Sequence, residues 1–417
     1  MKSINFRPLP LMLALLLLIP VLVIPNAAQS RPQKSESTKG DGKKNQRPTE
    51  EELKKREEER RREEEERNAI VDTEVERVKT EVVGIDAVVI NKKTGAIIGG
   101  LKKGNFAIFE DGKQQTISSF SSAESPITVT LLLEFSRWTE IFGSAAGGRF
   151  EPGTYEVIRP VAYFLSRFIK PPNDYASVVA FDMRPTPITD FTNDPNRLRA
   201  TIDLLLRNQP AFRENNLWDA LKFTLVGGRG DTVVLENSRE RYSDYSGMQD
   251  LKAPRKAIIL VASGIDTFSK INYSDARKIV QEAGVPIYII STGNLFFKKY
   301  EGYLGPTDSI SGMPGRLTFL QAQNAMNTIA KESGGAHFPM TFESEVPDIL
   351  QNINAELRNQ YNLTYDLDSP RVPGKRYKLE VKVDVDGDGV FDDKTYVVQH
   401  RPFYVPSAPA PAKKPSK

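Results

Sequence analysis

The sequence predicts an α/β fold in which a doubly wound, mostly parallel sheet is joined by an accessory β sandwich and by a disordered and charged-helical N-terminal region. Apolar runs without polar alternation occupy residues 127–133, 175–181, 256–263 and 285–291, a pattern typical of strands buried on both faces. Helical periodicities alternate with these runs, as in sheets covered by helices on both faces. Shorter strands with hairpin signals lie on both flanks and predict the sandwich.

The composition argues against several classes of function. With 417 residues, the chain is too long for one compact domain, so we expect two folded units with low-complexity ends. The formal net charge is only +3, and we expect no nucleic-acid partner. The absence of Cys excludes disulfides and thiolate chemistry. His337 and His400 are the only histidines, which argues against zinc sites and histidine acid-base catalysis.

Residues 1–30 have the three parts of a secretory signal peptide. Lys2 and Arg7 supply positive charge, residues 9–24 are almost wholly apolar, and residues 26–30 offer small side chains for cleavage. We therefore expect an exported protein, periplasmic or extracellular, with the signal removed. The alternative is an uncleaved membrane anchor, although the apolar run is marginal for spanning a bilayer.

Residues 31–48 contain no aliphatic side chain and predict a disordered linker. Residues 49–70 predict a charged helix, because Thr49 and Glu52 form a capping box. Its charged residues pair at a spacing of four in the favourable order: Glu52 with Arg56, Glu57 with Arg61, Glu58 with Arg62, and Glu63 with Arg67. This segment is either a solvated helix without a partner or a spacer or adhesive arm.

Residues 75–122 and 361–405 predict the two parts of the accessory β region. The first part has hairpin signals such as Asp111-Gly112, and the second alternates apolar and polar residues. Neither part suffices for an independent core, so we expect their strands to pair with each other. Residues 406–417 predict a disordered tail.

Residues 126–360 predict the α/β domain, with a more exposed strand at 184–191 and a short strand at 336–339. Pro171-Pro172 ends the first predicted helix, and Gly334-Gly335 is a helix C-cap signal. The predicted helices span 155–169, 196–206, 216–225, 274–283, 317–332 and 345–360.

Three stretches carry a resemblance to a known family. The buried strand in ITVTLLLEFSRW (127–138) ends at an acidic residue and a hydroxyl, LWDAL (217–221) opens a helix, and RKAIILVASGIDT (255–267) supplies a strand and its following loop. Over about residues 127–363 this order resembles the von Willebrand factor A (VWFA) domain. The preceding β region is similar to that of VWFA-related proteins of the Acidobacterial type. The resemblance implies a binding module more than an enzyme.

The family resemblance also implies a metal-ion-dependent adhesion site, with the pattern D-x-S-x-S on the first loop, Thr on the second and Asp on the third. Mg²⁺ prefers an oxygen octahedron, which such residues supply. Carried over by position, the chain has Glu134, Ser136, Trp138, Asn215 and Ser263 in these places, with Asp266 nearby but shifted. Only Ser136 matches the pattern, so the resemblance implies a degenerate site, and we expect no Mg²⁺ there.

Two interpretations of this apex remain. One is a scaffold whose metal site has decayed. The other, which we favour, is a metal-free ligand-binding surface in which aromatic and Arg side chains provide the contacts typical of protein hot spots. Its predicted residues are Glu134, Phe135, Ser136, Arg137, Trp138, Asn215, Trp218 and Ser263.

A second candidate site lies in the C-terminal β region. Asp384, Asp386, Asp388 and Asp392 occupy positions one, three, five and nine of a loop with Gly389 at position six, a spacing typical of calcium loops. The twelfth position is Thr and strands flank the loop, so it is either a calcium site or an acidic hairpin turn.

No motif for catalysis is present: the chain lacks a phosphate loop, a nucleophile elbow, and a His placed near Ser and Asp. Residues 227–254 predict an aperiodic surface loop, in which Arg229-Gly230-Asp231 is either an adhesive tripeptide or a chance match. We therefore expect an exported, non-enzymatic protein-binding module whose protein partner the sequence does not name. The alternative is a structural component docked permanently in a cell-envelope complex.

Overall fold

The computed structural model describes residues 82–122, 125–137, 168–208, 210, 212–231, 242–249, 251–253, 255–310 and 312–407. The chain divides into two compact units, Met1–Arg77 and Val78–Lys417, and all described residues belong to the second. The predicted signal peptide, linker and charged helix lie outside the described residues. So do Trp138, residues 155–167 and residues 408–417.

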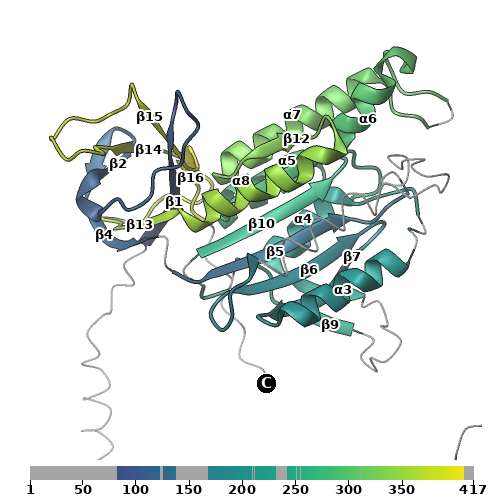
Figure 1. The fold of residues 1–417 in the computed structure, drawn as a ribbon, viewed down its shortest axis with the longest axis horizontal. Coiled ribbons are helices and arrows are strands. Elements are labelled where there is room, and N and C mark those ends of the chain that lie inside the picture. Colours follow the sequence, from purple (N-terminus) through teal and green to yellow (C-terminus); the bar gives the residue numbers. More distant parts are fainter. Residues whose placement is uncertain are drawn as a thin grey trace, which may run out of the picture. The chain divides into compact units, whose positions relative to one another are not determined.

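A six-stranded sheet forms the centre of the α/β domain, with strand order β12-β11-β10-β5-β6-β7 (Figure 1). All neighbouring strands are parallel except β7, which runs antiparallel to β6. Every residue of β5 is buried, as its uniformly apolar sequence predicts. The strands are β5 (Ile127–Glu134), β6 (Tyr175–Phe181), β7 (Pro185–Thr192), β10 (Arg255–Ala262), β11 (Ile287–Ser291) and β12 (His337–Pro339).

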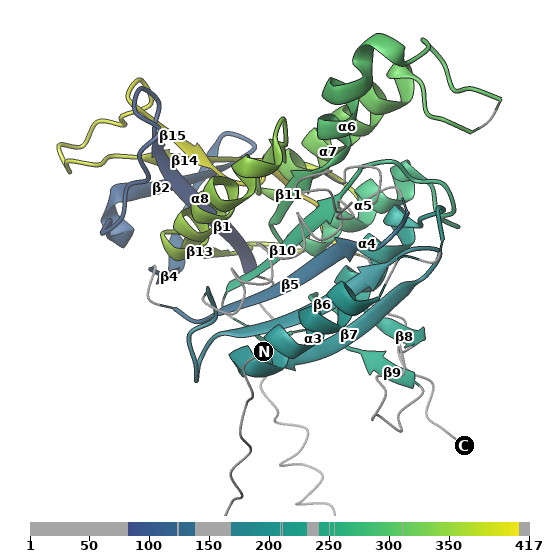
Figure 2. The same ribbon diagram turned by 45° about the vertical axis from the view of Figure 1, so that its right-hand side comes forward.

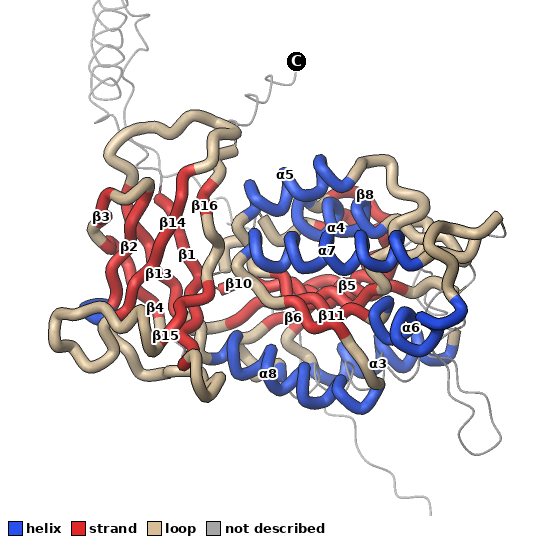
Figure 3. The backbone as a smooth tube through the Cα atoms, turned by 90° about the horizontal axis from the view of Figure 1, so that it is seen from above, coloured by secondary structure: helices blue, strands red, loops and turns tan. Residues whose placement is uncertain are grey.

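Helices cover both faces of this sheet, as Figure 3 shows. One core joins Leu131 and Leu133 of β5 to α3 and α8, and the other joins Leu132 to α4 and α5. The described helices are α3 (Pro195–Arg207), α4 (Leu217–Val226), α5 (Tyr273–Ala283), α6 (Gly293–Tyr300), α7 (Arg316–Ser333) and α8 (Val346–Arg358). Within the described part of the chain, no helix has the length and apolarity needed to cross a bilayer.

Eight further strands build two four-stranded antiparallel sheets around a shared core, with orders β15-β1-β13-β4 and β16-β14-β2-β3 (Figure 2). Each sheet combines strands from both flanks of the α/β domain, which confirms the predicted pairing. The N-terminal strands are β1 (Val82–Asn91), β2 (Phe106–Glu110), β3 (Lys113–Gln115) and β4 (Ile117–Ser121). The C-terminal strands are β13 (Tyr361–Asp366), β14 (Tyr377–Val383), β15 (Tyr396–Gln399) and β16 (Phe403–Tyr404).

The prediction of an aperiodic loop over residues 227–254 is wrong for residues 228–231 and 242–245, which form strands. β8 (Gly228–Asp231) pairs with β9 (Tyr242–Tyr245), so the Arg-Gly-Asp tripeptide lies within a strand. Tyr245 is buried, and its hydroxyl lies 2.9 Å from Thr130 Oγ1 and 3.0 Å from Ser177 Oγ. These hydroxyls on β5 and β6 need polar partners, and Tyr245 supplies one.

Candidate functional site

Four of the predicted apex residues meet at the carboxyl end of β5. Glu134 is only 2% exposed, and its Oε1 accepts hydrogen bonds from Ser136 Oγ at 2.6 Å and Asn215 Nδ2 at 3.0 Å. Its Oε2 accepts a hydrogen bond from the backbone N–H of Ser263 at 2.6 Å. One carboxyl group therefore joins β5 to the segment before α4 and to the end of β10.

The electrostatics of this cluster favour a structural role for Glu134. Burial raises the pKa of Glu134, and the hydrogen bonds from Ser136 and Ser263 act in the opposite direction. N–H groups of Asn215 and Ser263 point at the carboxyl group, whereas an Mg²⁺ site needs oxygen atoms around the ion. Asn215 and Ser263 thus both present donors to the Glu134 carboxyl group, and the absence of an adhesion-type metal ion from this cluster stays a prediction.

The other predicted apex residues differ in how much surface they offer. Arg137 is exposed, and its Nε donates to Pro210 O at 3.3 Å. Phe135 is half-buried and packs against the core. Trp218 is 7% exposed and its ring lies 5.3 Å from that of Tyr273, so most of the indole belongs to the core. Ligand binding at the apex stays a prediction, in which Arg137 offers the most accessible side chain among the described apex residues.

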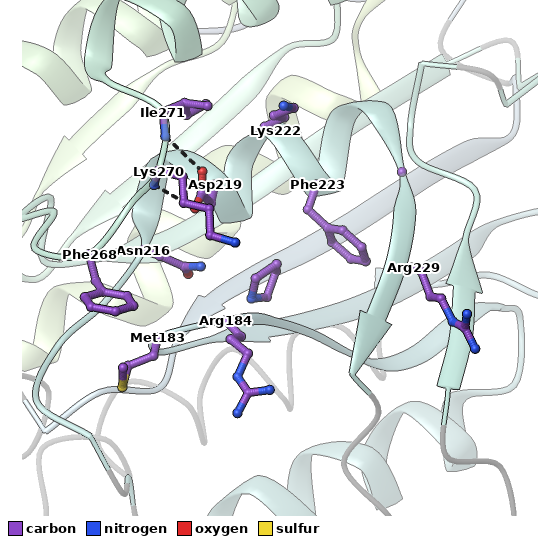
Figure 4. Close-up of a pocket in the computed structure, with 12 residues that line it drawn as sticks. Met183, Arg184, Asn216, Asp219, Lys222, Phe223, Arg229, Phe268, Lys270 and Ile271 are labelled. Atoms are coloured by element: carbon purple, nitrogen blue, oxygen red, sulfur yellow. Dashed lines mark hydrogen bonds between the residues drawn. The ribbon is translucent and has the colours of Figure 1, made fainter.

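A cavity of about 520 Å³ lies beside this cluster (Figure 4). Its walls come from the β6–β7 turn, the first turns of α4, β8, and the loop that follows β10. Asn216, adjacent in sequence to the Glu134 partner Asn215, forms part of the wall. The cavity therefore belongs to the same edge of the sheet as the predicted site, where ligands bind in open α/β sheets.

Hydrogen bonds fix the loop that closes one side of the cavity. The Asp219 carboxylate accepts from the backbone N–H groups of Lys270 at 2.9 Å and Ile271 at 3.2 Å. Ser269 Oγ accepts from the N–H groups of Trp218 at 3.0 Å and Asp219 at 3.1 Å. These contacts satisfy orphan donors in the first turn of α4 and join the loop to the helix.

The cavity could not be predicted from the sequence. Its lining residues are separated by long stretches of chain, from Met183 to Ile271, and no local motif marks them. The predicted parallel sheet gives only a general indication, because ligands in such folds bind among the loops that follow the carboxyl ends of the strands.

The acidic loop between β14 and β15 brings together three of its four predicted ligands. Oxygen atoms of Asp384, Asp386 and Asp388 all lie within 4.8 Å of one another. Backbone hydrogen bonds from Gly389 at 2.8 Å and Gly387 at 2.7 Å hold the pKa of Asp384 below its usual range. Asp392 instead accepts from the Val385 N–H at 2.8 Å. The three convergent carboxylates could hold a cation, and the calcium site stays a prediction.

The comparisons with known proteins give distant structural likenesses. No family model matches the sequence, and no curated protein matches it. The PilB minor pilin from Streptococcus sanguinis aligns at 13% identity and a TM-score of 0.38, over 59% of this chain and 63% of that chain. The vWF domain of the type V pili tip protein Mfa5 from Porphyromonas gingivalis aligns at 13% identity and a TM-score of 0.35, over 56% of this chain and 96% of that chain.

BatB from Bacteroides thetaiotaomicron aligns at 14% identity and a TM-score of 0.33, over 56% of this chain and all of that chain. This chain therefore corresponds to 63% of the length of PilB and to the whole of BatB. With TM-scores this low, the function of the chain has to be argued from its own residues.

Proposed function

We propose that this chain is an exported, non-enzymatic protein-binding module that binds its partner at the carboxyl edge of the parallel sheet. The observation that carries the proposal is the contrast between the hydrogen-bonded Glu134 carboxyl group and the open cavity beside it. Hydrogen bonds within the protein occupy both oxygens of Glu134, whereas the adjacent cavity of about 520 Å³ is open. The cavity is of the size that small ligands or partner side chains fill. The resemblance to the VWFA domain also favours binding.

The environments of the two histidines support a non-enzymatic role. Burial lowers the pKa of His337 to about 4, so this side chain is neutral at physiological pH. His400 Nε2 accepts from the Val381 N–H at 3.3 Å, and its Nδ1 lies 2.7 Å from Arg401 O. Both contacts are structural, and neither histidine belongs to the residues that line the cavity. Export, in turn, rests on the signal-like residues 1–30.

Affinity capture tests this function. The tagged full-length chain would be incubated with an envelope extract of the source organism, with and without EDTA, and retained proteins identified by mass spectrometry. We expect a specific protein to be retained, with loss of retention on Arg137→Ala/Trp138→Ala and no effect of EDTA. Arg199→Ala, an exposed change on α3, is the matched control. Retention that is unchanged by the double substitution would contradict binding through the apex.

The alternative, a permanently docked envelope component, has one structural feature in its favour. Large apolar side chains are exposed along the segment that joins α6 to α7 and on α7 itself: Tyr303, Ile310, Met313, Leu317 and Leu320. Exposed apolar groups of this kind mark protein interaction sites. A purified chain that is monomeric and captures its partner reversibly supports the binding module. Tight co-purification with an envelope complex through several washes supports the alternative.

A further inference from the structure

The cavity beside the Glu134 cluster is lined by four positively charged side chains from four separate elements. Arg184 comes from the β6–β7 turn, Lys222 from α4, Arg229 from β8 and Lys270 from the loop after β10. Among the described residues, Asp219 is the single carboxylate in the lining, and its two oxygens accept backbone N–H groups. The lining thus carries an excess of positive charge, although the chain as a whole is nearly neutral.

The interior of the same cavity is largely apolar. Phe223 is 8% exposed and Phe268 is 50% exposed, and both rings line the cavity together with Met183 and Ile271. Figure 4 shows the Lys270 and Phe223 side chains on opposite sides of the cavity, while the guanidinium groups of Arg184 and Arg229 point away from both. An occupant that matches these walls combines negative charge with apolar or aromatic groups.

Among the described residues, no carboxylate forms an ion pair with Lys222 or Lys270. Asp182 lies close to the lining residue Arg184, and its Oδ1 accepts a hydrogen bond from the backbone N–H of Arg184 at 3.2 Å. Asp182 lies outside the lining, and its carboxyl group interacts with Arg184, so the lining keeps a net positive charge.

Asn216 provides a second, independent indication of a ligand. Its side chain lines the cavity, the residue is 3% exposed, and its Oδ1 is buried without a donor within the described part of the chain. A buried acceptor without a donor is costly, and such groups are uncommon in folded proteins. A peptide N–H would satisfy this oxygen after a small rotation of the amide, whereas a fully ionised inorganic anion has no donor to give.

We propose that the cavity binds an acidic segment of a protein, with Asp or Glu side chains paired to Lys222 and Lys270 and an apolar or aromatic neighbour packed on Phe223 and Phe268. This inference rests on the proposed protein-binding function and specifies the chemistry of the partner. Charge complementarity of this kind selects partners and accelerates their association, and it weakens as salt is added.

Binding of a defined peptide tests the proposal. The probe is a fluorescein-labelled peptide of ten residues that alternates Glu with Phe, and its control carries Gln in place of every Glu. Anisotropy with the full-length chain should show binding of the acidic peptide at least about tenfold tighter than that of the Gln peptide, a difference that corresponds to about 1.4 kcal/mol. Raising the salt concentration from 50 to 500 mM should remove most of this difference.

The protein variants are chosen to separate the cavity from general surface charge. Lys222→Gln/Lys270→Gln should weaken binding of the acidic peptide by about tenfold. Lys331→Gln/Lys378→Gln, which removes the same charge from exposed positions on α7 and β14, should leave it unchanged. Thermal unfolding of each variant checks that the fold is retained.

Several results would overturn the proposal: no binding of the acidic peptide at 1 mM, equal affinity for the Gln peptide, or equal losses in the two double variants. Complete displacement of the acidic peptide by inorganic phosphate at the same concentration as the peptide would also overturn the proposal, because that result would indicate a site for small anions. Envelope capture separates this failure from that of the proposed function. If the wild type and Lys222→Gln/Lys270→Gln retain the same partner equally, the protein-binding function stands and the acidic-segment proposal fails.

Discussion

At the scale of single residues, Glu134 takes the place that the family resemblance assigns to a metal ligand, but its contacts are those of a structural cross-link. Its position at the end of β5 could be predicted from the sequence, because a buried strand that ends in a carboxylate is visible there. The hydrogen bonds that Asn215 and Ser263 donate to Glu134 could not be predicted from the sequence, because both contacts join segments that are distant in the chain.

Removing this cross-link should destabilise the fold. Glu134→Ala leaves the donors on Ser136, Asn215 and Ser263 without an acceptor, and we expect the free energy of unfolding to fall by roughly 2–4 kcal/mol. Glu134→Gln keeps the shape and one acceptor, so its loss should be smaller. Urea denaturation of the purified chain measures both. A melting temperature that drops on addition of EDTA in the Asp386→Asn/Asp388→Asn variant, which lacks the predicted calcium ligands, would contradict the metal-free interpretation of the apex.

At the scale of elements, the regular strands and helices could be predicted because apolar periodicity marks them. The sequence did not reveal α6, whose short span GNLFFKKY lacks a clear helical repeat, or the β8–β9 hairpin, which has a polar sequence. The latter depends on Tyr245, whose long-range contacts with β5 and β6 leave no local pattern.

Tyr245 anchors the hairpin to the sheet through its hydroxyl group. Tyr245→Phe should lower the free energy of unfolding by about 1–2 kcal/mol, because Thr130 Oγ1 and Ser177 Oγ lose a buried partner. The two hydroxyls keep their mutual contact at 2.8 Å, and Thr130 Oγ1 keeps its contact with Met248 Sδ at 3.0 Å. Tyr303→Phe is the matched control, since Tyr303 is 91% exposed. Equal unfolding curves for the wild type and Tyr245→Phe would show that this hydroxyl contributes no stability.

The acidic loop between β14 and β15 should respond to calcium. If Asp384, Asp386 and Asp388 bind the ion in the folded state, millimolar Ca²⁺ raises the melting temperature of the wild type, because a ligand that binds only the folded state stabilises it. Asp386→Asn/Asp388→Asn should abolish the increase, whereas Asp203→Asn, an exposed change on α3, should preserve it. A titration with no change in the wild type would indicate a plain hairpin turn.

At the scale of the whole molecule, contacts between the α/β domain and the sandwich include a buried carboxyl group. Glu356 of α8 accepts from Gln399 Nε2 of β15 at 2.9 Å, and burial raises its pKa to about 7. A folded-state pKa above the unfolded value means that the folded protein binds more protons. The contribution of Glu356 to stability is therefore full below about pH 4.5 and is lost as pH rises to 7.

The difference in stability between the wild type and Glu356→Gln isolates this effect. We expect it to change by on the order of 3 kcal/mol between pH 4.5 and 7.5, with the wild type losing stability relative to the variant as pH rises. The comparison is needed because half-buried His337, with its lowered pKa, has the opposite dependence below about pH 6.5. Parallel stability curves for the two proteins would show that Glu356 keeps an ordinary pKa.

The antiparallel pairing of Ser121 on β4 with Asn362 on β13 has a topological consequence. These two residues bracket the entire α/β domain in the sequence, yet they are opposite one another in a sheet. The α/β domain thus occupies the position of the loop that connects two paired antiparallel strands, β4 and β13. Both of its ends leave from one edge of the sandwich, as in domain insertions, where close termini let one fold be placed within another without breaking it.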